Sequence, residues 1–217
     1  MKEFFKKTFT KENLKKFFRT YIWLMVLLFV VDIVTKWVVV NHFGVDRMNM
    51  GANRENGEAI QIIKDFCYIG GAINNKAAFS LGPHRVVLLL ISIVMTGGFI
   101  AYYIVQYKKL STGYKIAFAL MIAGGFGNLI DRAFYWPGTT GFDGVVDWIL
   151  FYFGSWAFPM FNIADSCLVI GIIIIFVLII IEEVKNSREK RKKGVYKYSP
   201  EQLKAKEKVE NEENKGE

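Results

Sequence analysis

Apolar residues gather into four long blocks along this chain, and polar stretches separate the blocks. They cover about residues 21–40, 86–105, 114–132 and 162–181. An α-helix rises about 1.5 Å per residue, so about 20 residues are needed to cross a hydrocarbon core ~30 Å thick. Each block is long enough or nearly so, and the last is too apolar on every face for a helix of a soluble protein. The pattern predicts an all-α membrane protein with four transmembrane helices.

Two of the stretches between the blocks have the character of small folded pieces. Residues 41–85 include a segment at 59–72 that is rich in Ile and aromatic residues, which favours strands. Residues 133–161 contain several Trp, Tyr and Phe residues, which suit the level of the lipid headgroups. We therefore expect a small β-rich cradle outside the membrane at 41–85, and an outer loop or short helix at 133–161.

The distribution of Lys and Arg predicts how the helices cross the membrane. The chain has 217 residues, 53% of them hydrophobic, and a net charge of +8, totals that would also suit a soluble protein. Of its 28 Lys and Arg residues, 21 lie in residues 1–20, 106–115 and 182–217. Because basic residues stay on the cytoplasmic side, both termini and the 106–115 connection are expected to be cytoplasmic. The two longer loops then face outward.

The ends of the chain differ from the part that holds the spans. Residues 1–20 place Phe and Leu at helical spacing among lysines, which predicts a basic amphipathic leader on the membrane surface. Residues 185–217 form a charged cytoplasmic tail. The four-span domain between them covers residues 21–184. Basic ends of this kind suit anionic lipid, and we expect no nucleic acid as a partner.

A small set of polar residues lies inside the spans or at their outer ends. They are Asp32 and Lys36 in the first span, Asn128, Asp131 and Arg132 in the third, and Asn162 and Asp165 in the fourth. A charge at the bilayer centre costs on the order of 2.5–3.5 kcal/mol, so its presence needs a reason. With both termini inside, the three helices bring these groups to one depth, the outer third of the membrane. Asp147 follows a short apolar run in the outer loop, so we expect it near the same site.

Carboxylates are the groups of this site best suited to chemistry. The two Cys and two His residues are scattered, which argues against a disulfide framework or a zinc site. Two neighbouring carboxyl groups do not ionise together easily, so one keeps a proton while the other acts as a base. Such a pair activates a water for attack on an amide carbonyl. The residues alone leave open a scaffold, in which aspartates pair with Lys36 and Arg132 only to hold helices together.

A small transporter with a proton relay is the other alternative. Such a relay needs polar residues through the depth of several helices. Apart from its tyrosines, the second span has only Ser92 and Thr96 as polar residues, and it has no charge. The pattern therefore favours a localised site over a relay.

Five motifs, in order along the chain, resemble those of the lipoprotein signal peptidase family. They are Asp32-Ile-Val-Thr-Lys36, Asn74-Asn75-Lys76-Ala77-Ala78-Phe79, Gly124-Gly125-Phe126-Gly127-Asn128-Leu129-Ile130-Asp131-Arg132, Val145-Val146-Asp147 and Asn162-Ile163-Ala164-Asp165. Only the leader and the tail lie outside the resemblance. One position departs from the family pattern, because Lys76 stands where the family has Gly. That departure bears on the role of Asn74 and not on the carboxylates.

The resemblance implies an aspartic endopeptidase in the cytoplasmic membrane of a bacterium, acting as a monomer near the outer face without metal or cofactor. Its partners would be membrane lipid and prolipoproteins, whose signal peptide it would cut just before a diacylglyceryl-modified cysteine. By motif position, Asp147 and Asp165 would be the catalytic pair. The supporting or substrate-binding residues would be Asp32, Lys36, Asn74, Gly125, Asn128, Asp131, Arg132, Asn162 and Ala164.

Overall fold

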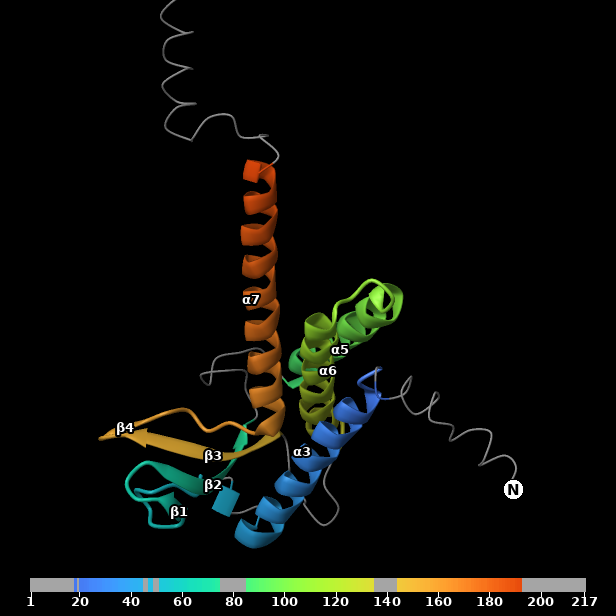
Figure 1. Cartoon of the computed structure of the whole chain (residues 1–217). Helices are drawn as coiled ribbons and strands as arrows, with labels where there is room; N and C mark the ends of the chain where they lie inside the picture. The colour runs from blue at the N-terminus through green and yellow to red at the C-terminus, as the bar shows by residue number, and fades with distance from the viewer. Residues whose placement is uncertain are drawn as a thin grey trace, which may run out of the picture. The chain divides into compact units, whose positions relative to one another are not determined.

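The computed structural model describes residues 18, 20–44, 47–48, 51–74, 85–134 and 144–192. Its helices are α3 (Ile22–Phe43), α5 (Arg85–Gln106), α6 (Thr112–Ala133) and α7 (Ile163–Lys192). Its strands are β1 (Ile60–Ile63), β2 (Cys67–Asn74), β3 (Val145–Phe153) and β4 (Trp156–Ala157), as Figure 1 shows. The chain divides within α7 into two compact units, Met1–Ile175 and Phe176–Glu217. The amphipathic leader expected at 1–20 lies almost wholly outside the described residues, as do Lys76 and the tail beyond residue 192.

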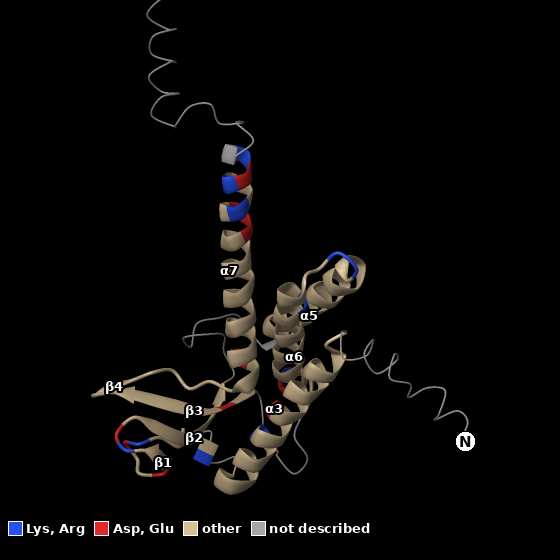
Figure 2. Ribbon diagram, viewed as in Figure 1, with Lys and Arg blue, Asp and Glu red and all other residues tan. Residues whose placement is uncertain are grey.

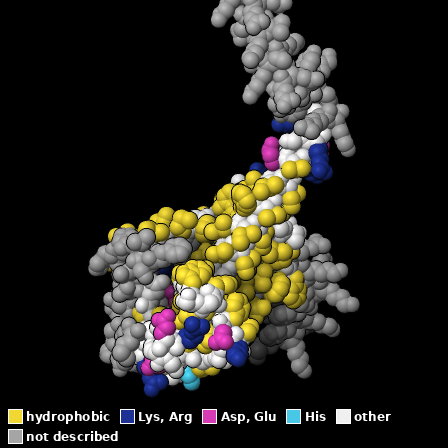
Figure 3. All heavy atoms as spheres, turned by 90° about the vertical axis from the view of Figure 1, so that its left-hand side faces the viewer, with side chains coloured by type: hydrophobic (Ala, Val, Ile, Leu, Met, Phe, Trp, Pro, Cys, Tyr) yellow, Lys and Arg dark blue, Asp and Glu magenta, His cyan; other side chains and the backbone are white. Residues whose placement is uncertain are grey.

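Four of the described helices are long and apolar enough to cross a membrane, which confirms the four predicted spans. Figure 3 shows hydrophobic side chains gathered along the helices, with charged side chains beyond them. The helix bounds differ from the predicted ones by a few residues, except in α7, which continues to Lys192. The residues after Ile181 are mostly Glu, Lys and Arg, which favour helix without apolar contact. Hydropathy therefore predicted where the apolar part of α7 ends and not where the helix ends.

Helix α6 is the central helix of the first unit. Half of its most apolar 18-residue window is buried, 50% against 17% for each of the other three helices. Glycines permit the close approach, since a Cβ on Gly124 would collide with the backbone oxygen of Ala164 in α7. A Cβ on Gly125 would stand 2.5 Å from Thr96 Oγ1 in α5. Small residues at such crossings let membrane helices pack backbone to backbone.

The strands form one antiparallel sheet in the order β1-β2-β3-β4. Strands β1 and β2 confirm the predicted strand character of residues 59–72. The expectation of an outer loop or short helix at 133–161 is wrong for Val145–Phe153, which form β3. This segment is rich in β-branched and aromatic residues, and its backbone is paired with β2 from Val145 to Phe151 and with β4 beyond. Burial on both faces hid the alternation that would have predicted a strand.

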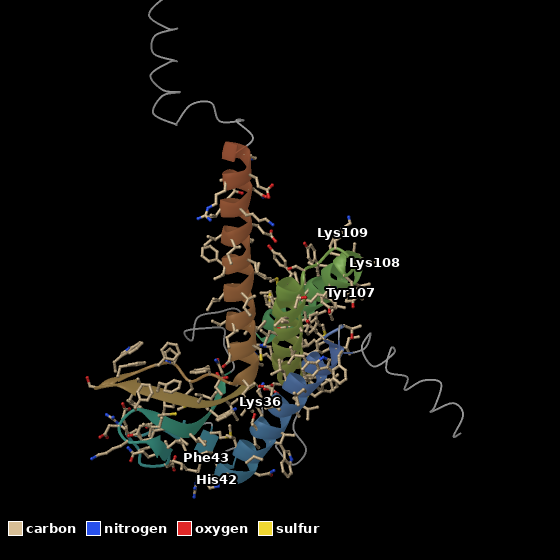
Figure 4. The ribbon with its side chains drawn as sticks, viewed as in Figure 1. Lys36, His42, Phe43, Tyr107, Lys108 and Lys109 are labelled. Carbon is tan, nitrogen blue, oxygen red and sulfur yellow. The ribbon has the colours of Figure 1, made fainter. Side chains whose placement is uncertain are left out.

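A buried cluster joins the sheet to the end of α3. It consists of Val39, Val40, Phe43, Met48, Ala52 and Val146. In Figure 4, Lys36 and Phe43 of α3 lie on the side of the sheet, whereas Lys108 and Lys109 lie at the far end of α5. The cluster therefore holds β3 against the helix ends, and it brings Asp147, the neighbour of Val146, to the level of the buried polar residues.

Candidate active site

The polar residues predicted to converge do come together, where α3, α6, α7 and β3 meet. Figure 2 shows acidic residues of these elements near the level where the sheet adjoins the helices. Among the described residues, the buried polar or charged ones are Asp32, Lys36, Thr96, Asn128, Asp131, Asp147 and Asn162. All but Thr96 belong to the predicted set. The polar residues of separate helices therefore lie together, as their common depth predicts.

Asn162 and Asp165 cap the beginning of α7 reciprocally. The Oδ1 of Asn162 accepts the backbone N–H of Asp165 at 2.9 Å, and Asp165 Oδ2 accepts the backbone N–H of Asn162 at 3.2 Å. This arrangement is a capping box, in which two side chains satisfy backbone donors that the first helical turn leaves free. The helix macrodipole also favours a negative carboxylate at this end. The three-residue spacing thus holds the Asp165 side chain in one place.

A third carboxylate meets the same helix end from α3. Asp32 Oδ1 accepts the backbone N–H of Ala164 at 2.8 Å. Gly127 of α6 lies against this contact, because a Cβ there would collide with Asp32 Oδ2 and stand 2.9 Å from the Cβ of Ala164. The junction of the three helices therefore requires a glycine at 127, and it leaves little room for a side chain larger than alanine at 164.

Lys36 is fully buried at the centre of a charged cluster. Its Nζ lies 2.8 Å from Asp32 Oδ2 and 2.8 Å from Asp131 Oδ2, and it donates to Asn128 Oδ1 at 3.2 Å. The expected ion pair between Asp32 and Lys36, one turn apart, is present. Because an ammonium has three donors, all three find an acceptor here. These partners matter for stability, because removing one partner of a buried ion pair leaves an uncompensated charge and costs ~3–5 kcal/mol.

The beginning of β3 is tied to α6 and α7 by side chains. Asp131 Oδ2 accepts the backbone N–H of Val146 at 3.2 Å. Asn162 Nδ2 donates to the backbone oxygen of the same residue at 3.2 Å. The residue next to Asp147 is therefore fixed through both of its backbone polar groups. This contact gives Asp131 a positioning role in the geometry.

Both carboxyl oxygens of Asp147 accept side-chain amides. Asn162 Nδ2 donates to Oδ1 at 2.8 Å, and Asn74 Nδ2 donates to Oδ2 at 2.9 Å. Burial and, next, the negative charge of Asp165 raise the pKa of Asp147 from 3.8 to about 7, while the two amide donors act in the opposite direction. A carboxyl group with this pKa exchanges its proton near neutral pH.

Asn128 and Asn162 connect the two carboxyl groups. Asn128 Nδ2 donates to Asp165 Oδ1 at 2.7 Å, and Asn162 Nδ2 donates to Asn128 Oδ1 at 3.1 Å. Asn162 bonds to Asp147 through its side chain and to Asp165 through its backbone. One residue therefore contacts both carboxyl groups.

Arg132 is oriented by a residue that sequence reasoning did not assign to the site. Its Nη1 donates to Ser92 Oγ of α5 at 3.4 Å and to the backbone oxygen of Asn128 at 3.3 Å. No aspartate among the described residues lies within ion-pair distance of Arg132. The sequence did carry a signal for Ser92, because Ser92 and Thr96 are the only Ser or Thr residues of this largely apolar span. Both of them contact α6.

Gly125 is placed by the structure against α5, where it permits the contact with Thr96. Asn74 contacts Asp147, and the backbone N–H of Ala164 contacts Asp32. Among the described residues, no group of three or more His, Cys, Asp or Glu is arranged to hold a metal ion.

Comparison with known proteins gives a consistent result. The family model for signal peptidase (SPase) II matches residues 24–181. The chain is 34% identical over 158 residues to the lipoprotein signal peptidase of Halalkalibacterium halodurans, a match that covers 72% of this chain and 88% of that protein. Two structures of a bacterial membrane enzyme, obtained by the in meso method at 2.3 and 1.9 Å resolution, are similar, each at 28% identity. The first has a TM-score of 0.59 and covers 76% of this chain and 89% of its own; the second has 0.56, 74% and 92%.

Proposed function

The chain belongs to the signal peptidase II family of aspartic peptidases, which remove signal peptides from prolipoproteins, and we propose that Asp147 and Asp165 are its catalytic pair. The observation that carries the proposal is the bridge made by Asn162, which donates to Asp147 Oδ1 at 2.8 Å and to Asp165 Oδ2 at 3.2 Å. Two carboxyl groups held this way share one site, and the proton on Asp147 fits the acid of the pair.

The chemistry of such a pair follows from its two protonation states. The ionised carboxylate takes a proton from a water, whose oxygen bonds to the carbonyl carbon of the scissile amide. The protonated carboxyl group donates to the carbonyl oxygen, which gains negative charge as the tetrahedral intermediate forms. Proton transfer to the amide nitrogen then lets the C–N bond break, giving a carboxylic acid and an amine. Water is the only co-reactant consumed.

The substrate side follows from the place of the site. The pair lies at the ends of the spans next to the sheet, where a signal peptide held in the membrane would present its cleavage point. We propose that the cut falls just before a diacylglyceryl-modified cysteine, whose acyl chains remain in lipid. The basic residues at the ends of the chain and in the α5–α6 connection support an orientation with both termini in the cytoplasm and the site near the outer face. The described contacts of the pair all come from one chain, which supports action as a monomer.

The test uses the two isosteric variants Asp147→Asn and Asp165→Asn. Each removes one ionisable group and keeps the side-chain shape, so each is expected to leave a diacylglyceryl-modified prolipoprotein uncleaved in detergent or vesicles. Asp65→Asn is the matched control, because Asp65 is an exposed residue of the β1–β2 turn with a positive φ that Asn also adopts. The control is expected to cleave at the wild-type rate. Cleavage by either folded pair variant would overturn the assignment.

A further inference from the structure

Lys36 lies inside the site without contacting either member of the catalytic pair. Its three donors go to Asp32, Asp131 and Asn128. The contact with Asp32 lies within α3, and the contact with Asp131 joins α3 to α6. These two contacts are sufficient to explain a structural lysine. The third is different, because the side chain that receives it also contacts the pair.

The side-chain amide of Asn128 is the link between Lys36 and Asp165. Its Oδ1 accepts from Lys36 Nζ at 3.2 Å and from Asn162 Nδ2 at 3.1 Å, while its Nδ2 donates to Asp165 Oδ1 at 2.7 Å. The oxygen and nitrogen of an amide are distinguished by their partners. An ammonium only donates, so the edge of the amide that faces Lys36 must be the accepting oxygen. The donating edge is thereby turned towards Asp165.

We propose that Lys36 is a positioning residue that acts through Asn128 to keep Asp165 in its ionised form, as the base of the pair. The inference rests on the proposed function. With Asn128 so oriented, both oxygens of Asp165 accept an N–H group, Oδ1 from Asn128 and Oδ2 from the backbone of Asn162 at 3.2 Å. Donors at both oxygens stabilise the carboxylate over the acid. Without Lys36, Asn128 Oδ1 keeps the donor from Asn162 and loses the charged one, so the amide is held less firmly in this orientation. If the amide turned, its oxygen would face Asp165 and would require a proton there.

The orientation of Asn128 matters more here than the charge of Lys36 alone. The charged groups around Asp165 are Asp147 on β3, Asp131 and Arg132 on α6, and Asp32 and Lys36 on α3. Two carboxylates already share the ammonium of Lys36, which reduces its field at a third. The amide, in contrast, contacts Asp165 directly, and its dipole is aligned and strengthened by the donor on its oxygen.

The pH dependence of kcat/KM separates this role from a merely structural one. The first variant combines Lys36→Met with Asp131→Asn, which removes one positive and one negative group and leaves the formal net charge of the cluster unchanged. The acid limb of its profile is expected to move to higher pH by about one unit, a tenfold loss of the ionised fraction at low pH. In this variant the alkaline limb, which reports the proton of Asp147, is expected to move to higher pH as well, because the charge of Lys36 lowers the pKa of Asp147.

Asn128→Leu is the second variant, and it leaves the ion pairs of Lys36 in place. It is expected to shift the acid limb in the same direction, and the combination of all three substitutions should add no further shift, because Lys36 acts through Asn128. Thermal unfolding and gel filtration establish which variants fold. If the Lys36→Met/Asp131→Asn variant does not fold, the acid limb of Asn128→Leu tests the proposal instead. An unshifted acid limb with a uniform loss of kcat in a folded variant would overturn the proposal. Cleavage by Asp165→Asn would instead overturn the proposed function, so the two failures are distinguishable.

Discussion

Asn162 and Asp165 hold each other at the beginning of α7, each side chain accepting the backbone N–H of the other, at 2.9 and 3.2 Å. The residue proposed as catalytic is therefore also part of the cap of its helix. Its carboxylate is held by a hydrogen bond from the backbone, which is more rigid than a side chain. Precision of this kind favours catalysis, because a reacting group displaced by about 1 Å can lose on the order of 100-fold in rate.

Substitutions of Asn162 are expected to separate the cap from the bridge. Ser accepts an N–H as well as Asn does at an N-cap, but it has no amide to donate to Asp147. Asn162→Ser should therefore keep the cap but lose the donors to Asn128, Val146 and Asp147, at a cost of about 1–3 kcal/mol of stability and about 100-fold in kcat. Asn162→Ala should lose the cap as well, about 1 kcal/mol more. Thermal unfolding in detergent and a prolipoprotein cleavage assay measure the two effects. Full activity of Asn162→Ser would show that the bridge has no catalytic part.

Asp147 is expected to lower the stability of the protein as pH rises. Burial and the nearby charge of Asp165 raise the pKa of Asp147 from 3.8 to about 7, so the folded state binds this proton more tightly than the unfolded state. The free energy of unfolding therefore falls progressively as pH rises from about 4 to about 7. Above that range Asp147 causes no further change in it. Asp147→Asn carries no such charge. Its apparent Tm should exceed that of the wild type by an amount that grows over this pH window, reaching several degrees at pH 8, and a difference independent of pH would contradict the expectation.

Gly127 is expected to tolerate no side chain, in contrast to a glycine on the outer surface of α5. A Cβ on Gly127 would collide with Asp32 Oδ2 and press on Ala164, whereas a Cβ on Gly97 would meet nothing within 4 Å. Gly127→Ala should destabilise the protein by about 1–3 kcal/mol through overpacking. Gly97→Ala, the matched control in a helix interior, should be neutral or stabilise by roughly 0.5–1 kcal/mol. Equal unfolding temperatures for the two variants would show that the three-helix junction can relax.

The sequence predicted the spans and the polar residues of the site better than it predicted the sheet. Hydropathy reports which residues suit lipid, so it located the four spans, and a few polar residues inside them pointed to one depth. Residues 145–153 suit both an apolar loop and a strand, and only their pairing with β2 distinguishes the two. The partners of Asp131 and of Ser92 were not predictable, because they depend on how α3, α5, α6 and β3 pack together.

The cluster around Lys36 also has a consequence for how the protein is made. Asn128 lies 92 residues after Lys36, so α3 emerges from the ribosome long before α6 exists. During that interval the pairing of Asp32 with Lys36, one helical turn apart, leaves the nascent helix with no net charge in its span. Asp131 and Asn128 arrive later, and Asp165 arrives in the last span of all. The proposed catalytic pair is therefore complete only after α7 has been synthesised, so we expect no peptidase activity from the growing chain before that point.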